Sequence, residues 1–403
     1  MLRAGIGINY GDDAFLVGVN ACQEAFLKLG ADTHAAKLII VFASVKYDQE
    51  EVLRGVRSVS GGVPLAGAST AGEITGAGSS KKNSVAVMVL ASNTVNFFLS
   101  VAEGLKDHSR EAGKQVADQV KADAEKLGED LRFFMMFPDG RAGNGSEIVR
   151  GVLDSLGEHF PVAGGASGDD LHFEKTYQYC GEKVYSGAVV GIGFSGEFSF
   201  GVAVEHGWTP IGLPKKVTKS EGSVLYELDG KPAIRLYEDY FGEENARELK
   251  ENVLAKNAIM YPLGVSMEGK AHLLIRDPLT VDADGAITCA AEVPEGAEVR
   301  LMVGSVEKAI EMAGVAAAAA KKNLDGKEPR VAFVWSGVAR RKLFGERADE
   351  EIRTIQKELG ADVPIIGFYT YGEQAPMNGE IKNQEQCNPE FHNGTVVICA
   401  LGE

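Results

Sequence analysis

The stretch Val363–Glu373, which reads VPIIGFYTYGE, contains the pattern around which the chain is organised. Val63–Glu73 (VPLAGASTAGE) repeats it in register, and Phe160–Asp170 (FPVAGGASGDD) repeats it again. In every copy a proline is followed by a glycine at the third position and by an acid at the ninth. A shared spacing in separate parts of the chain predicts an internal repeat.

The sequence around each copy is also similar. An apolar run typical of a buried strand precedes each copy, and a second apolar run follows it. Further upstream, apolar residues at helical spacing predict helices at Ala14–Leu29, Arg110–Leu127 and Glu307–Asn323. We therefore predict an α/β protein in which repeated strand and helix units form mixed sheets.

Residues between Glu197 and about Gly296 lack the repeat. Short strand-like runs there are joined by turns such as Asp282–Gly285, which predicts an antiparallel element. We expect two lobes. Residues 1–197 would contain the first two units, and residues 198–403 would contain the antiparallel element followed by the third unit.

Composition excludes several classes of protein. The formal net charge of −16 opposes binding to nucleic acid, which needs clustered cationic side chains. No apolar run approaches the roughly 20 residues of a membrane-spanning helix, so we expect a cytoplasmic protein without membrane insertion. The five cysteines are odd in number and show no CxxC spacing, which favours reduced thiols over a zinc site.

The repeated turns are candidate binding elements, because open α/β sheets bind ligands beyond the carboxyl ends of their strands. The third copy is bulky and hydroxylated at Tyr369, Thr370 and Tyr371, whereas the other two copies are small. If the copies face one another, the third would supply aromatic walls to a common hollow. The alternative is that proline, glycine and acid only stabilise the end of a strand.

Arginines near predicted strand ends are candidates for holding a carboxylate, because a guanidinium group can bind it through two hydrogen bonds. These are Arg276 and one of the neighbours Arg340 and Arg341. The glycine-rich turn Pro138–Gly145 could also hold an anion at the start of a helix. The predicted ligand site combines these groups with the third turn: Arg276, Arg340, Tyr369, Thr370, Tyr371 and Glu373.

Catalytic and metal-binding patterns are absent from the sequence. The histidines show no paired ligand spacing, although a single histidine such as His206 or His392 can be the axial ligand of a haem. A hydrolase could use paired acids among Glu73, Asp169, Asp170 and Glu373. No nucleophile or cofactor motif supports that interpretation, so we expect a protein that is not an enzyme and has no resident cofactor.

Several motifs resemble the FIST family of sensory proteins, in the order that the family shows them. They are Ala68–Glu73, Pro138–Gly140, His206–Trp208, Tyr226–Ala233 and Gly367–Glu373. The resemblance spans nearly the whole chain and implies a FIST N-terminal domain at 1–197 and a FIST C-terminal domain at 198–403.

The resemblance implies a signal-input protein that binds a small ligand, such as an amino acid. Binding would be relayed to a separate partner, a histidine kinase or a cyclic-di-GMP enzyme, because no kinase or GGDEF-type segment occurs in this sequence. Some members of the family bind haem and respond to nitric oxide through a histidine. A haem sensor using His392 or His206 is therefore the alternative function.

Overall fold

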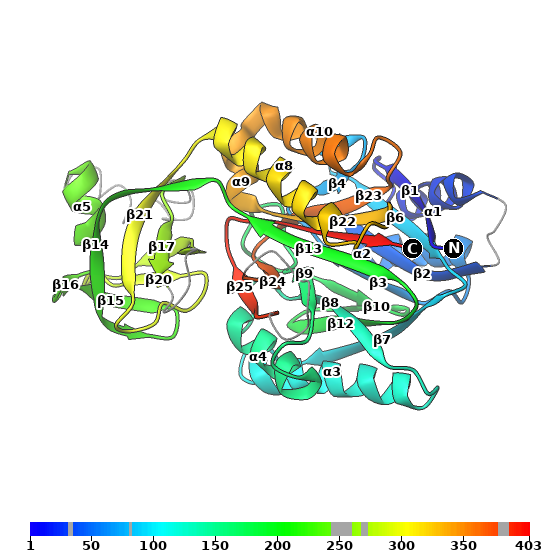
Figure 1. Cartoon of the computed structure of the whole chain (residues 1–403), viewed down its shortest axis with the longest axis horizontal. Coiled ribbons are helices and arrows are strands. Elements are labelled where there is room, and N and C mark those ends of the chain that lie inside the picture. Colours follow the sequence, from blue (N-terminus) through cyan, green and yellow to red (C-terminus); the bar gives the residue numbers. More distant parts are fainter. Residues whose placement is uncertain (31–34, 80–82, 243–259, 267–272, 378–386) are drawn as a thin grey trace.

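The computed structural model describes residues 1–30, 35–79, 83–242, 260–266, 273–377 and 387–403. Its strands form three six-stranded sheets and one larger sheet that is antiparallel. Figure 1 shows the six-stranded sheets and their helices as one large body, with the antiparallel sheet as a smaller lobe beside it. No helix in the described ranges is long and apolar enough to cross a bilayer. The predicted α/β class with mixed sheets is confirmed.

The first unit is built on a sheet covered by α1 (Ala14–Leu29) and α2 (Gln49–Ser60). The bounds of α1 are those predicted from the apolar spacing. In spatial order, the strands of this sheet are β1 (Arg3–Asn9), β6 (Val85–Ala91), β2 (Ala36–Ala43), β3 (Leu65–Ser69), β10 (Gln178–Cys180) and β11 (Lys183–Tyr185).

The second unit has the same plan, with α3 (Ser109–Glu125) and α4 (Gly145–Leu156) packed against one another. The predicted helix Arg110–Leu127 corresponds to α3, with its ends shifted by one or two residues. In spatial order, the strands are β25 (Pro389–His392), β24 (Glu373–Pro376), β9 (Val162–Gly165), β8 (Leu131–Pro138), β12 (Ala188–Gly196) and β7 (Val95–Glu103).

The third unit carries α8 (Val306–Lys322), α9 (Val338–Phe344) and α10 (Ala348–Leu359). The predicted helix Glu307–Asn323 corresponds to α8. In spatial order, the strands are β13 (Ser199–Glu205), β26 (Val396–Gly402), β22 (Pro329–Gly337), β23 (Ile365–Thr370), β4 (Glu73–Thr75) and β5 (Gly78–Ser79).

The three units exchange strands in a cycle. The hairpin β4–β5 of the first unit extends the sheet of the third, and β10–β11 of the second unit extends the sheet of the first. The pair β24–β25 of the third unit extends the sheet of the second. The three repeated stretches therefore meet around one axis, as three copies of a single interface.

Backbone hydrogen bonds between the repeated turns close a ring around this axis. Each bond joins equivalent positions of two successive units: Ala71 N to Tyr369 O (3.0 Å), Tyr371 N to Ala166 O (3.2 Å) and Gly168 N to Ser69 O (3.0 Å). Buried backbone amides need such partners, so the ring fixes how the units face one another.

The common hollow expected between the units is filled by aromatic side chains. The ring centroid of Phe42 lies 5.4 Å from that of Phe137 and 4.6 Å from that of Phe368, and all three side chains are fully buried. Ala68 and Gly165 are the counterparts of Phe368 in the other copies, as the strand registers show. One large side chain therefore fills the space that two small residues leave. The expectation of a hollow at this point is wrong.

The repeated glycine and proline have a structural role at each strand exit. A Cβ added to the glycine would collide with a carbonyl oxygen of the neighbouring parallel strand: Gly67 with Val41, Gly164 with Met136 and Gly367 with Val334. The carbonyl oxygen of each proline accepts a hydrogen bond from that same strand: Pro64 from Ile39, Pro161 from Phe134 and Pro364 from Ala332. This supports the alternative interpretation for these two positions.

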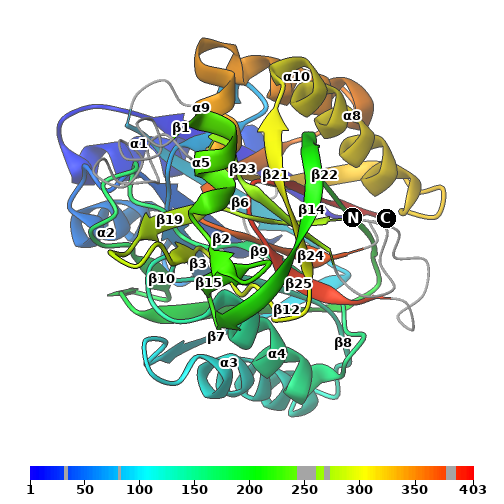
Figure 2. The same cartoon turned by 90° about the vertical axis from the view of Figure 1, so that its left-hand side faces the viewer.

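The antiparallel element predicted near the start of the C-terminal part is confirmed as the smaller lobe, which faces the viewer in Figure 2. Its elements are β14 (Trp208–Glu221), β15 (Val224–Leu228), β16 (Lys231–Pro232), α5 (Arg235–Phe241), β17 (Leu263–Ser266), β18 (Leu273–Arg276), β19 (Pro278–Val281), β20 (Ile287–Cys289) and β21 (Glu298–Gly304). We call it the inserted lobe, because β13 before it and α8 after it both belong to the third unit.

Candidate functional site

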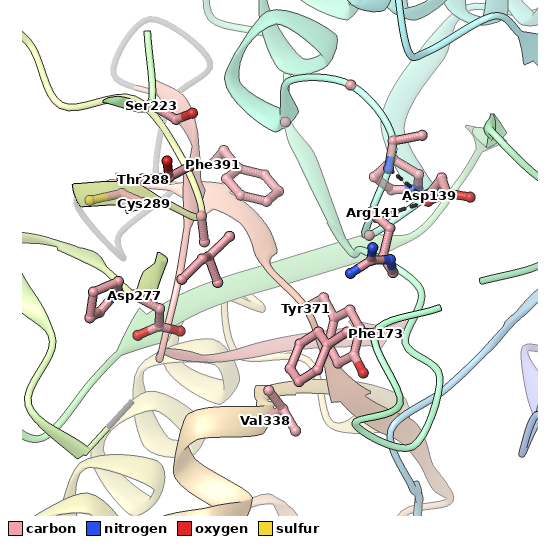
Figure 3. Close-up of a pocket in the computed structure, with 18 residues that line it drawn as sticks. Asp139, Arg141, Phe173, Ser223, Asp277, Thr288, Cys289, Val338, Tyr371 and Phe391 are labelled. Atoms are coloured by element: carbon pink, nitrogen blue, oxygen red, sulfur yellow. Dashed lines mark hydrogen bonds between the residues drawn. The ribbon is translucent and has the colours of Figure 1, made fainter. Parts of the chain in front are cut away.

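A cleft of about 330 Å³ lies between the inserted lobe and the large body. The body contributes the turn after β8 and single side chains from the second and third units: residues 138–143, Gly145, Phe173, Val338, Tyr371 and Phe391. The inserted lobe contributes Ser223, residues 277–279 and residues 288–290. Figure 3 shows Asp139 and Arg141 of the body on one side of the cleft and Asp277, Thr288 and Cys289 of the inserted lobe on the other. This volume suits a small metabolite.

Asp277 supplies a carboxyl group from the inserted lobe. It follows β18 directly, its side chain is buried, and its Oδ1 has no hydrogen-bond partner among the described residues. Burial raises the pKa of Asp277 to about 7, and the neighbouring charge of Arg276 opposes that rise. A buried polar atom without a partner costs stability, so its persistence at a cleft is typical of a binding group.

Arg141 supplies a cation from the opposite side. Its turn is held by Asp139, whose Oδ1 accepts hydrogen bonds from the amides of Arg141 (2.8 Å) and Ala142 (2.9 Å). The other oxygen of Asp139 accepts from the amide of Gly187 (2.9 Å). The exposed guanidinium group of Arg141 reaches into the cleft (Figure 3) and forms no ion pair within the described ranges.

The predicted anion-binding turn Pro138–Gly145 does line the cleft, but the start of α4 is already capped. The side chain of Asn144 accepts hydrogen bonds from the amides of Ser146 (3.0 Å) and Glu147 (3.2 Å). These amides are therefore engaged, and Arg141 is the group of this turn that can meet an anion in the cleft.

Aromatic rings form much of the remaining wall. Phe173 and Tyr371 are stacked, with ring centroids 5.0 Å apart and planes at 18°. The hydroxyl of Tyr371 donates to Asp169 and accepts from the amide of Leu171 (2.9 Å), which fixes its ring. Phe391 lies against Gly145 and Gly372 at a distance that leaves no room for a Cβ on Gly372. These contacts define the position of each ring in the apolar wall.

Only Tyr371 of the six predicted site residues lines the cleft. Tyr369 is fully buried and its hydroxyl lies 3.4 Å from Glu351, while the hydroxyl of Thr370 donates to Glu373. Glu373 also accepts from the amide (3.0 Å) and hydroxyl (2.6 Å) of Thr395. Burial raises the pKa of Glu373 to about 8. The structure places these groups in the interior of the body.

Arg276 lies beside the cleft with its guanidinium turned into the protein. It donates to the carbonyl oxygens of Glu292 (2.7 Å), Ile275 (3.0 Å) and Phe391 (3.1 Å), and burial lowers its pKa to about 10. The bond to Phe391 crosses from the inserted lobe to the body. Arg276 thus positions the neighbouring Asp277 and holds the two lobes together.

Arg340 is fully buried and forms an ion pair with Glu351, at 2.7 Å. It also donates to the carbonyl oxygens of Ala309 (3.0 Å) and His206. Its charge is satisfied inside the third unit and does not reach the cleft. The sequence could not reveal this ion pair, because Glu351 lies on a different helix, α10, and spacing along the chain does not give the distance between two helices.

His206 and His392 do not line the cleft either. The Nδ1 of His206 accepts from the amide of Trp208 (2.9 Å), and the Nε2 of His392 is 3.0 Å from the carbonyl oxygen of Ala375. In the described part of the chain no cluster of His, Cys, Asp and Glu could hold a metal ion. The surroundings of these histidines therefore do not fit a haem at the cleft. The haem alternative stays a prediction, which the absorption spectrum of haem-reconstituted protein tests.

Sequence reasoning missed the groups that line the cleft most directly. Asp277 follows the predicted site residue Arg276, and Arg141 lies in the glycine-rich turn Pro138–Gly145. Each was therefore next to a feature that the sequence singles out. No sequence pattern indicates Phe173 or Phe391, because these residues are far apart in the chain and only the fold places them in the same wall of the cleft.

The fold and the cleft define a class of protein: three α/β units around an axis, with an antiparallel lobe inserted over a ligand-sized cleft. The chain belongs to the FIST family. The FIST N domain matches residues 37–231 and the FIST C domain matches residues 233–376. The boundary between the two matches falls inside the inserted lobe.

The relatives include two uncharacterized proteins. One from Methanocaldococcus jannaschii is 32% identical over 56% of this chain and 44% of its own length. One from Mycobacterium tuberculosis is 26% identical over 94% of this chain and 96% of its own length. Solved structures similar over the whole chain include a chorismatase, with 9% identity, a TM-score of 0.39 and 98% of that chain covered. A cyanuric acid hydrolase has 9% identity and a TM-score of 0.37, with 100% of that chain covered. Similarities of this size carry no argument about function.

Proposed function

We propose that this protein is a non-enzymatic sensor that binds a small zwitterion, an amino acid, in the cleft between its lobes. The observation that carries the proposal is one pair of groups. Asp277, whose buried carboxyl has an oxygen without a partner among the described residues, and Arg141, whose guanidinium forms no ion pair with any of them, line the same cleft from opposite sides. An ammonium group would pair with Asp277, and a carboxylate would pair with Arg141.

The energetics favour this pairing over a neutral ligand. A hydrogen bond to a charged group contributes roughly 1.5 to 3 kcal/mol, about twice the contribution of a neutral one. A free amino acid provides both charges on one carbon, next to a side chain that can occupy the apolar part of the cleft.

Signal output would follow from the position of the cleft. A ligand held by Asp277 on the inserted lobe and by Arg141 on the body ties the two lobes together. Any difference in their relative position between the free and bound states would then be stabilised by the ligand. A separate histidine kinase or cyclic-di-GMP enzyme is the kind of partner that the family suggests.

A thermal-shift screen of the common amino acids at millimolar concentration tests the proposal. We expect at least one to raise the melting temperature of the wild type, and the shift to be lost in Asp277→Asn. Asp284→Asn is the matched control, because Asp284 is an exposed acid of the same lobe outside the cleft. If no amino acid stabilises the wild type, the proposal fails.

A further inference from the structure

The segment from Asp169 to Lys175 has an unusual backbone. Asp170, Leu171 and Phe173 adopt positive φ angles of 54°, 66° and 57°. L-residues with large side chains avoid this region, because the Cβ then lies too close to the backbone. Such conformations persist where the surrounding structure enforces them, and they cluster at ligand clamps and functional sites.

The surroundings enforce this conformation from both neighbouring units. The carboxylate of Asp169 accepts from the amides of Phe173 (2.9 Å), Glu174 (2.6 Å) and Lys175 (2.9 Å). Its Oδ1 also accepts from the hydroxyl of Tyr371 in the third unit. Asp170 accepts from Ser44 Oγ (2.7 Å) and Val45 N (3.2 Å) in the first unit.

This strained backbone conformation determines the position of the Phe173 ring. Phe173 lies flat against Tyr371 at the edge of the cleft and lines it, although its neighbours His172, Glu174 and Lys175 are polar and exposed. Here the ring is half-buried and presents area to the cleft.

We propose that the stacked pair Phe173 and Tyr371 is the specificity element of the cleft and selects amino acids with an aromatic side chain. This inference rests on the proposed function, in which Asp277 and Arg141 bind the charged end. The side chain of the ligand packs on the stacked pair, with Phe391 in the same wall. Aromatic rings gain stabilisation from one another beyond the area that they bury. A cleft of about 330 Å³ also has more room than a small amino acid fills.

Isothermal titration calorimetry on the full chain tests this inference with three probes. L-phenylalanine and L-cyclohexylalanine have nearly the same size, but only the first is aromatic, and L-alanine lacks the ring altogether. We expect L-phenylalanine to bind about five-fold tighter than L-cyclohexylalanine, as aromatic stacking predicts. L-alanine should bind more weakly than either.

The variant Phe173→Leu keeps an apolar side chain and removes one ring of the stacked pair, so it should reduce the preference for L-phenylalanine over L-cyclohexylalanine. Phe173→Tyr keeps the ring and should keep the preference. Phe15→Leu is the control, because Phe15 is a half-buried ring of α1 outside the cleft. If Phe173→Leu does not fold, the comparison of the two probes on the wild type still decides.

Two failures are distinguishable. Equal affinity of the wild type for L-phenylalanine and L-cyclohexylalanine overturns the aromatic selection and leaves the proposed function standing. Binding of none of the three probes overturns the aromatic selection as well, and stabilisation by other amino acids then decides whether the proposed function stands.

Discussion

Asp277 and Arg141 come from different lobes and line one cleft from opposite sides. Asp277 is buried with an oxygen that has no partner among the described residues, whereas Arg141 is exposed. Two opposite charges held apart in this way are complementary to a zwitterion.

Ligand affinity should depend on pH through Asp277. Its pKa in the free protein is about 7, so the carboxylate that pairs with an ammonium group forms only as pH rises through that value. We therefore expect an amino acid to bind about ten-fold more tightly at pH 8 than at pH 6. Calorimetry at both pH values measures this. A dependence that survives in Asp277→Asn would assign the effect to another group.

Glu373 should make stability fall with pH. Its folded pKa of about 8 lies above the ordinary value of 4.5, so the folded state holds a proton that the unfolded state releases. Stability from this group is present below pH 4.5 and is lost as pH rises toward 8. Glu373→Gln should show a smaller loss between pH 5 and pH 8, by on the order of 3 kcal/mol. Urea unfolding at both pH values measures it, and parallel profiles would contradict the prediction.

Arg340 should be essential for stability. Removing it in Arg340→Met would leave Glu351 charged and buried without its partner, which costs about 3 to 5 kcal/mol. The control Arg347→Met removes exposed ion pairs with Glu307 and Glu350 and should cost far less stability, because solvent screens both pairs. Chemical denaturation compares them. Equal losses would mean that the buried pair contributes no more than a surface pair.

The repeated glycine should not tolerate a side chain. Gly367→Ala places a methyl group against the carbonyl oxygen of Val334 and should destabilise the protein by about 3 kcal/mol. Gly62→Ala is the control, because Gly62 has open space around its Cβ position. If melting temperatures of both variants match the wild type, the glycine in the repeat has another role.

The sequence predicts what is local and repeated. The bounds of α1 and the existence of three strand exits follow from apolar spacing and from the proline, glycine and acid pattern. The exchange of β4–β5, β10–β11 and β24–β25 between units could not be predicted, because short strands do not reveal which distant sheet they join. Phe368 illustrates the same limit. Its large side chain was expected to form the wall of a hollow. In the structure it fills the space that the small residues Ala68 and Gly165 leave.

The candidate site was predicted in part. Tyr371 was expected to line a pocket and does, whereas the charges of Arg276 and Arg340 are directed into the protein. A sequence shows that an arginine is present, but it does not show whether the guanidinium group faces a cleft or the protein interior. Asp277 and Arg141 became candidates only when the inserted lobe was seen to lie over the turn of the second unit.

The most direct test separates the two charges of the ligand. Calorimetry would compare the best-binding amino acid, its methyl ester and its des-amino acid on the wild type, Asp277→Asn and Arg141→Gln. We predict that Asp277→Asn weakens the amino acid and the ester by about ten-fold and leaves the des-amino acid unchanged. Arg141→Gln should weaken the amino acid and the des-amino acid and leave the ester unchanged. If both variants affect all ligands equally, or none of them, the amino acid is not held between Asp277 and Arg141.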